Sequence, residues 1–147
     1  MPILWRISNY ADLSGIGGLH VSGRWHSKGR PIIYTAEHPS GAMNEMLVNI
    51  AREDLPDNFQ FLKIELTDDV LVEGIGPEHL PANWAQDRSV TRAFGDKWLA
   101  QQRGLALRVP SALVPETFNV LLNPAHPDAA KMRIVLTLKA GIDLRFR

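Results

Sequence analysis

The segment SGRWHSKGRPIIYTAEHP, residues 22–39, holds the side chains of this sequence that are best suited to bind an anion. Arg24 and Arg30 each follow a glycine, and Lys28 lies between them. The planar guanidinium of arginine matches pairs of phosphate oxygens, so the segment could hold a pyrophosphate. A solvated, charged hairpin is the competing explanation. We expect any chemistry of this chain to centre on this segment.

Glu45 and Ser111 are two further polar residues, and each has an ordinary structural explanation. Helical spacing of about 100° per residue places Glu45 roughly 150° from the centre of its helix's apolar stripe, which indicates a surface carboxylate. Ser111 lies in VPSALVP and lacks the GxSxG pattern of a hydrolase, so its surroundings alone indicate a turn residue.

Common metal and nucleotide motifs are missing from the sequence. The glycines at positions 15, 17 and 18 lack the third glycine of a dinucleotide fingerprint, because His20 stands in its place. Residues 12–20 are predicted as a sharply turning loop. The histidines have neither HExxH pairing nor helical spacing, so we expect no metal site among His20, His26, His38, His79 and His126.

Two amphipathic helices are predicted to position these residues. The first has Ser40 as its N-cap and runs to about Glu53, with an apolar stripe of Ala42, Met43, Met46, Leu47, Ile50 and Ala51. The second covers residues 88–102 and is closed by Gly104, with an apolar face of Val90, Phe94, Trp98 and Gln101.

Strand-forming segments surround both helices. Alternating and β-branched residues predict strands over 3–7, 31–36, 59–66, 70–72, 105–109, 120–122 and 133–139. The resulting order of strands and helices is not the strict alternation of a doubly wound sheet. We therefore predict an α+β fold, with a mixed β-sheet core and a few covering helices.

The composition indicates a single domain over residues 1–147. A chain of 147 residues with 45% hydrophobic content can build a core, and without cysteine it has no disulfide or thiolate zinc site. Sixteen basic and sixteen acidic residues cancel, so we expect no direct binding of nucleic acid. We find neither a signal peptide nor an apolar run of membrane-spanning length, and we expect a cytoplasmic protein that does not bind membranes.

An ordered set of short motifs resembles the RES-domain family: WRIS, GRWHSKGRPIIYTAEHP, GAMNEMLVN, VPSALVP and NVLLNP. The similarity runs across nearly the whole chain. The arginine, glutamate and serine that give the family its name fall on Arg24, Glu45 and Ser111, and the family's tyrosine falls on Tyr34. RES proteins are toxins of type II toxin–antitoxin pairs. The resemblance implies an ADP-ribosyltransferase-like fold, NAD as substrate and no bound cofactor, and an Xre-type helix-turn-helix antitoxin that covers the active site.

The resemblance also implies a task for each family residue, because cleavage of the nicotinamide–ribose bond passes through an oxocarbenium-like transition state. Arg24 would bind phosphate, and Tyr34 would present an aromatic face to the nicotinamide or an adjacent ring. Glu45 would stabilise the cationic ribose or orient the nucleophile, and Ser111 would hydrogen-bond the ribose or the amide. The helix edge that carries Glu45 would then close over a substrate cleft. Second candidates for phosphate binding are Arg6 and Arg30.

Four functions compete at this point. The first is depletion of NAD by hydrolysis or phosphorolysis, and the closest alternative is mono-ADP-ribosylation of a host protein. A non-enzymatic antitoxin-binding module is disfavoured, because all four family positions are occupied. A ribonuclease that uses His20 or His26 is disfavoured by the neutral net charge.

Overall fold

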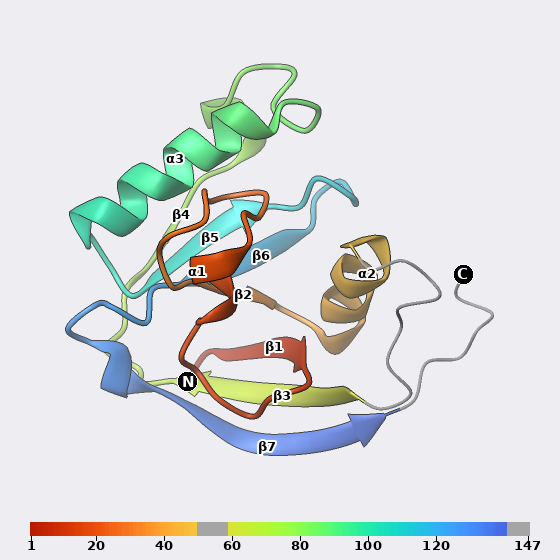
Figure 1. Ribbon diagram of the computed structural model, residues 1–147, viewed down its shortest axis with the longest axis vertical. Helices are drawn as coiled ribbons and strands as arrows, with labels where there is room; N and C mark the ends of the chain where they lie inside the picture. Colours follow the sequence, from red (N-terminus) through yellow and green to blue (C-terminus); the bar gives the residue numbers. More distant parts are fainter. Residues whose placement is uncertain (50–58, 141–147) are drawn as a thin grey trace.

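Seven strands form one sheet in the part of the chain that the computed structural model describes, residues 1–49 and 59–140. The order across the sheet is β4-β5-β6-β2-β1-β3-β7, and the pairing is antiparallel except between β4 and β5 (Figure 1). The elements in chain order are β1 (Ile3–Ser8), α1 (Gly17–His20), β2 (Ile33–Ala36), α2 (Pro39–Asn49), β3 (Phe59–Leu66), β4 (Val72–Gly74), η2 (Pro77–His79), α3 (Arg88–Gln101), β5 (Ala106–Pro110), β6 (Phe118–Leu122), η3 (Ala129–Lys131) and β7 (Met132–Ala140). The predicted α+β class is confirmed.

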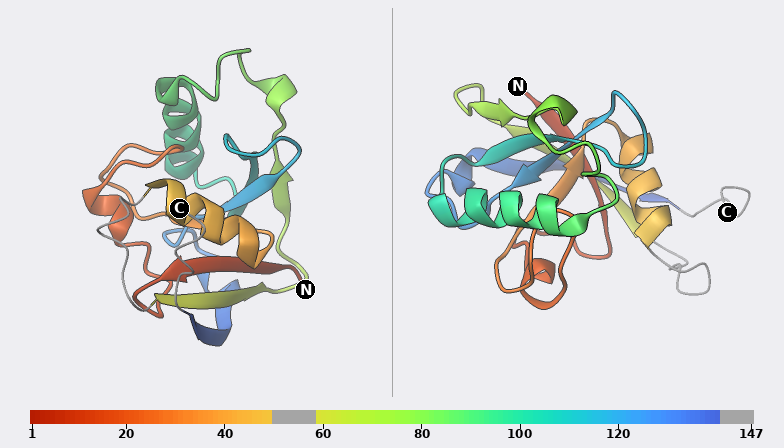
Figure 2. Two further views of the ribbon diagram at one scale, coloured as in Figure 1. Left: turned by 90° about the vertical axis from the view of Figure 1, so that its right-hand side faces the viewer. Right: turned by 90° about the horizontal axis from the view of Figure 1, so that it is seen from above.

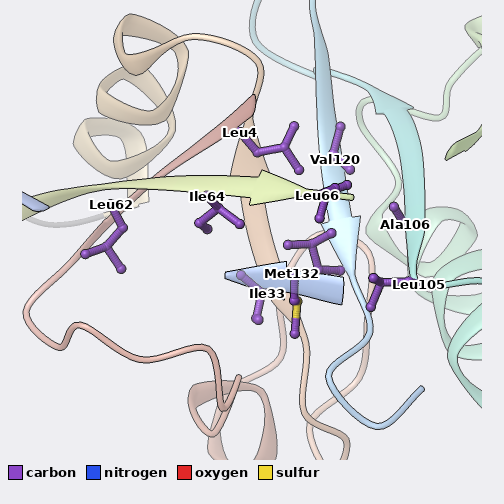
Figure 3. Close-up of a cluster of buried hydrophobic side chains, with 10 residues drawn as sticks. Leu4, Ile33, Leu62, Ile64, Leu66, Leu105, Ala106, Val120 and Met132 are labelled. Atoms are coloured by element: carbon purple, nitrogen blue, oxygen red, sulfur yellow. The ribbon is translucent and has the colours of Figure 1, made fainter. Parts of the chain in front are cut away.

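The sheet consists of two halves that meet at a narrow junction. β1 and β2 share one register pair, Trp5 with Ala36, whereas β1 pairs with β3 along its whole length. One buried cluster draws residues from both halves, so the halves fold over a common core (Figures 2 and 3). Each fully buried large aliphatic side chain there contributes about 1.5–3 kcal/mol. The cluster comprises Leu4, Ile33, Leu62, Ile64, Leu66, Leu105, Ala106, Val120, Leu122 and Met132.

A second cluster lies on the other face of β5 and β6, because side chains alternate along a strand. Leu107, Val109 and Leu121 point to this face, where α3 and the loop before β2 cover them (Figure 1). The covering residues are Trp25, Ile32, Trp98 and Leu99. The segment that carries Arg24 is thus packed between the sheet and α3.

Helix α2 begins at Pro39, one residue before the predicted N-cap. Ser40 lies inside the first turn, so the N-cap prediction is wrong; the fixed φ of proline suits a first helical position. The predicted stripe is confirmed where it is described, with two buried residues, Ala42 and Leu47, and two half-buried ones, Met43 and Met46. Ile50, Ala51 and the predicted end at Glu53 lie outside the described residues.

Helix α3 is capped by Asp87 and buries a face one position away from the predicted one. Its buried residues are Thr91, Gly95, Trp98 and Leu99, whereas Val90 and Phe94 are half-buried and Gln101 is exposed. The reason lies outside the helix, since the backbone of Trp25 packs against Gly95. The helix is closed by Gln102, with a left-handed φ of 49°, and not by Gly104.

The other strand predictions differ from the structure mainly at their ends. β3 has the predicted bounds, β4 lies two residues later than predicted, and the predicted loop 12–20 contains the short helix α1. None of the helices in the described ranges is long and apolar enough to span a membrane.

Candidate active site

A cleft of about 510 Å³ opens at the junction of the two sheet halves. β1 and β2 supply one wall and α2 supplies another, with further lining residues from the loop after α1, the start of α3 and the β5–β6 region. The family residues Arg24, Tyr34 and Glu45 all line this cleft. Ser111 contacts this cleft indirectly, because its hydroxyl donates a hydrogen bond to Glu45. It also lines a neighbouring surface hollow.

Glu45 lies on the cleft wall formed by α2 and is half-buried. Its Oε1 accepts hydrogen bonds from Ser111 Oγ at 3.2 Å and Asn119 Nδ2 at 2.8 Å. The solvated surface position that helical spacing indicated is therefore wrong. Two donors from distant parts of the chain fix the orientation of this carboxylate, as a reactive carboxylate requires.

Ser111 is 8% exposed and has two structural tasks. Its Oγ accepts the backbone N–H of Leu113 at 3.1 Å and donates to Glu45. The residue is thus both the turn residue indicated by its two proline neighbours and a support for the carboxylate.

Tyr34 presents its ring to the cleft while its hydroxyl points into the Trp25–His26 loop. The hydroxyl oxygen accepts the Trp25 N–H at 3.1 Å and lies 2.7 Å from His26 Nδ1. Burial raises the pKa of Tyr34 to about 12, so the phenol keeps its proton and donates to His26. His26 Nε2 then donates to the Gly18 carbonyl at 3.2 Å. This chain of hydrogen bonds fixes the tyrosine and the loop together.

His26 is 2% exposed, so the structure gives it a supporting position rather than that of a free acid or base. Burial lowers the pKa of His26 from its ordinary 6.5, an effect that the hydrogen bond to Gly18 partly offsets. As the pH falls, the unfolded chain therefore takes up this proton first. The stability from neutral His26 is complete above the unfolded-state pKa and is lost as the pH falls through the folded-state pKa.

We expect the melting temperature of the wild-type protein to fall more steeply between about pH 7 and pH 5 than that of His26→Gln. Thermal unfolding over this range measures both slopes. His20→Gln is the control, since His20 is exposed and its variant should keep the wild-type slope. If the melting temperatures of wild type and His26→Gln change with pH by the same amount, neutral His26 does not stabilise the fold as we propose.

Arg24 is held at the cleft by contacts on both sides. Its Nη1 donates to the Ala85 carbonyl at 3.1 Å, and its own carbonyl accepts the Thr91 hydroxyl. Desolvation and the neighbouring Arg88 lower the pKa of Arg24, while Glu45 raises it. The guanidinium therefore lines the same cleft as the carboxylate that the resemblance assigns to the reaction.

The two secondary arginine candidates differ in position. Arg6 lines the cleft and donates to the Tyr34 carbonyl at 3.4 Å, and burial lowers its pKa. Arg30 is exposed and is not among the cleft-lining residues, so the structure does not bring it to the other candidates. The lining residues that sequence reasoning missed include Arg88 and Asn119. Asn119 lies in the motif NVLLNP, which offered a signal, whereas Arg88 lies in none of the motifs.

Comparison with known proteins agrees with this architecture. The RES domain family model matches residues 3–147. "Toxin Res" of Pseudomonas putida is 49% identical over 137 residues, covering 90% of this chain and 91% of the relative. "Prs ADP-ribosylating toxin" of Sphingobium sp. is 40% identical over 135 residues, covering 85% and 84%.

A solved structure shares the fold at low sequence identity. The crystal structure of the M. tuberculosis MbcT–MbcA toxin–antitoxin complex matches with a TM-score of 0.76 and 18% identity, over 95% of this chain and 84% of that chain. The family model and the relatives, which are named as toxins, together define the class as that of RES-type toxins. The chain belongs to the RES domain family.

Proposed function

We propose that this toxin cleaves the bond between nicotinamide and ribose in NAD. The observation that carries the proposal is the Glu45 carboxylate, which Ser111 and Asn119 hold on a cleft wall beside Arg24. NAD joins a diphosphate to a ribose that becomes cationic when nicotinamide departs. A cleft with guanidiniums and one oriented carboxylate suits both charges.

In the proposed reaction the C1′–N bond breaks and its electron pair leaves with neutral nicotinamide. Glu45 stabilises the positive charge that develops on the ribose. Water then adds to C1′ and releases its proton to Glu45 or solvent, which gives ADP-ribose. Tyr34 offers its ring to a planar group of the substrate, because its hydroxyl is already hydrogen-bonded within the loop.

The nucleophile distinguishes three outcomes of the same chemistry. Water gives ADP-ribose, phosphate gives ADP-ribose 1″-phosphate, and a protein side chain gives an ADP-ribosylated protein. The name of the Sphingobium relative, "Prs ADP-ribosylating toxin", favours transfer to a host protein as the second candidate.

NAD labelled in its adenylate half separates these outcomes. If the toxin depletes NAD, we expect the label in small-molecule products. These are ADP-ribose when water is the acceptor and ADP-ribose 1″-phosphate when phosphate is the acceptor. Label recovered mainly on a macromolecule in a bacterial extract would contradict depletion and support transfer. Label that remains in intact NAD under all conditions would contradict both.

We further propose that an Xre-type helix-turn-helix antitoxin covers the cleft. The toxin–antitoxin complex among the solved structures supports an antitoxin as partner. The chain also offers an exposed apolar rim, since Val21, Val48 and Leu113 line the cleft and are 68%, 61% and 38% exposed. Such a rim suits a partner that buries apolar surface over the cleft mouth.

Hydrogen exchange of the toxin with and without its antitoxin tests this arrangement. We expect the antitoxin to slow amide exchange around Arg24 and Val48. Protection restricted to β7, the strand at one edge of the sheet, would contradict an antitoxin seated on the cleft.

A further inference from the structure

Three guanidiniums lie near one another at the α3 end of the cleft. Arg24 and Arg88 line the cleft, and both Arg88 and Arg92 lower the pKa of Arg24 by charge repulsion. Arg92 lies next to this pair, because its Nε donates to the carbonyl of Gly23, the residue before Arg24. Positive charges brought together in this way repel one another, and a bound anion relieves that repulsion.

The carboxylates that the structure describes near these arginines do not form ion pairs with them. Within residues 1–49 and 59–140, none of the ion pairs includes Arg24, Arg88 or Arg92. Asp87 accepts from the N–H and hydroxyl of Ser89, and Asp96 accepts the N–H of Ser27. Among the lining residues in the described part of the chain, Glu45 is the one carboxylate, and it raises the pKa of Arg24. The described residues at this end of the cleft therefore carry an excess of positive charge.

Arg88 stands where a helix least favours a cation. It is the first residue of α3, a helix of 14 residues whose first turn contains no acidic side chain. The N-cap carboxylate of Asp87 offsets part of the positive charge of this helix N-terminus, and the remainder repels a guanidinium there. The exposed Arg88 makes no side-chain hydrogen bond among the described residues that would offset this repulsion.

We propose that Arg88 is a further phosphate-binding residue, which joins Arg24 in a subsite for phosphoryl groups at the α3 end of the cleft. The subsite takes either the diphosphate of the dinucleotide or a free phosphate ion that serves as acceptor, since both present clustered anionic oxygens. An anion between the two guanidiniums converts their mutual repulsion into two favourable interactions. The assignment rests on the proposed function only for the identity of the ligand.

Arg92 has a different task, because its Nε donates to the Gly23 carbonyl at 2.7 Å. That bond fixes the residue immediately before Arg24. Arg92 is therefore a positioning residue, and Arg88 is the residue whose guanidinium remains available to a ligand in the described part of the chain.

Calorimetric binding to the intact chain, with Arg88→Gln and Arg88→Lys as variants, tests the subsite. The probes are ADP-ribose, which carries the diphosphate without nicotinamide, and inorganic phosphate. We expect Arg88→Gln to weaken ADP-ribose about tenfold or more, as for a lost charged hydrogen bond, and Arg88→Lys to weaken it less. Lys97→Gln is the matched control, since Lys97 is exposed on the same helix and outside the cleft lining.

The two probes distinguish the ligand sources. Loss of ADP-ribose affinity alone assigns the subsite to the dinucleotide, and loss of phosphate affinity alone assigns it to an acceptor phosphate. Affinities for both probes that stay within twofold of wild type, or that fall equally in Lys97→Gln, would overturn the proposal. Nicotinamide release is a separate readout, so a chain that binds ADP-ribose through Arg88 but leaves NAD intact refutes only the proposed reaction.

Discussion

Replacing Glu45 by glutamine is expected to lower the rate of NAD cleavage by a factor on the order of 10²–10⁴. Glutamine has nearly the same shape, and its amide oxygen can still accept from Ser111 and Asn119, so the local structure should persist. What is lost is the negative charge that stabilises the cationic ribose. The expected pattern is a low kcat with little change in affinity for ADP-ribose.

Glu78→Gln is the matched control for this substitution, because Glu78 is exposed in η2 and does not line the cleft. It should cleave NAD at the wild-type rate. A chromatographic assay of released nicotinamide measures all three proteins, and unfolding curves verify that Glu45→Gln is folded. A folded Glu45→Gln protein that turns over NAD within a few-fold of wild type would remove Glu45 from the reaction.

Replacing Gly95 by alanine is expected to destabilise the protein by about 1–3 kcal/mol and to displace Arg24. A Cβ at position 95 would overlap the Trp25 carbonyl oxygen and would lie 2.7 Å from its carbonyl carbon. Both atoms belong to the backbone, so no rotamer change relieves the overlap. Either α3 or the loop that carries Arg24 must move.

Gly17→Ala is the control, since a Cβ at position 17 meets no atom within 4 Å. Alanine should be tolerated there or slightly stabilising, because glycine lowers helix stability by about 0.5–1 kcal/mol relative to alanine. Denaturant unfolding measures the stability of both variants, and ADP-ribose binding reports on the cleft. A Gly95→Ala protein with wild-type stability and affinity would show that the close approach of α3 to Trp25 is unimportant.

The position of Glu45 shows what helical spacing can and cannot predict. The spacing correctly separated Glu45 from the apolar stripe of α2, because that stripe depends only on local periodicity. It could not predict that the opposite side faces a cleft. The two residues that hold the carboxylate, Ser111 and Asn119, are 66 and 74 positions away in sequence. Only the family resemblance anticipated the cleft.

The segment around Arg24 likewise has a position in the fold that its local sequence did not predict. Its charges and glycines favoured a solvated hairpin, yet Trp25 and His26 are each 2% exposed. Their burial depends on Gly95 of α3, about 70 residues later, which leaves room for the backbone of Trp25. This contact also explains why the buried face of α3 differs from the apolar pattern.

Strand prediction succeeded where alternation against a core gave a clear local signal. β3 was predicted with its observed bounds because buried Leu62, Ile64 and Leu66 alternate with more exposed residues. β4 was misplaced because it is short, lies at the sheet edge and has an exposed Val72. Its position is set by parallel pairing with β5, which local sequence does not encode.

The central claim is that this RES domain toxin breaks the nicotinamide–ribose bond of NAD in the cleft that contains Arg24 and Glu45. The most direct test incubates the purified chain with NAD and follows free nicotinamide and the remaining NAD together. We predict that nicotinamide appears mole for mole as NAD disappears, and that Glu45→Gln abolishes both changes. Intact NAD after prolonged incubation with the folded protein, with phosphate and bacterial extract supplied as acceptors, would contradict the account.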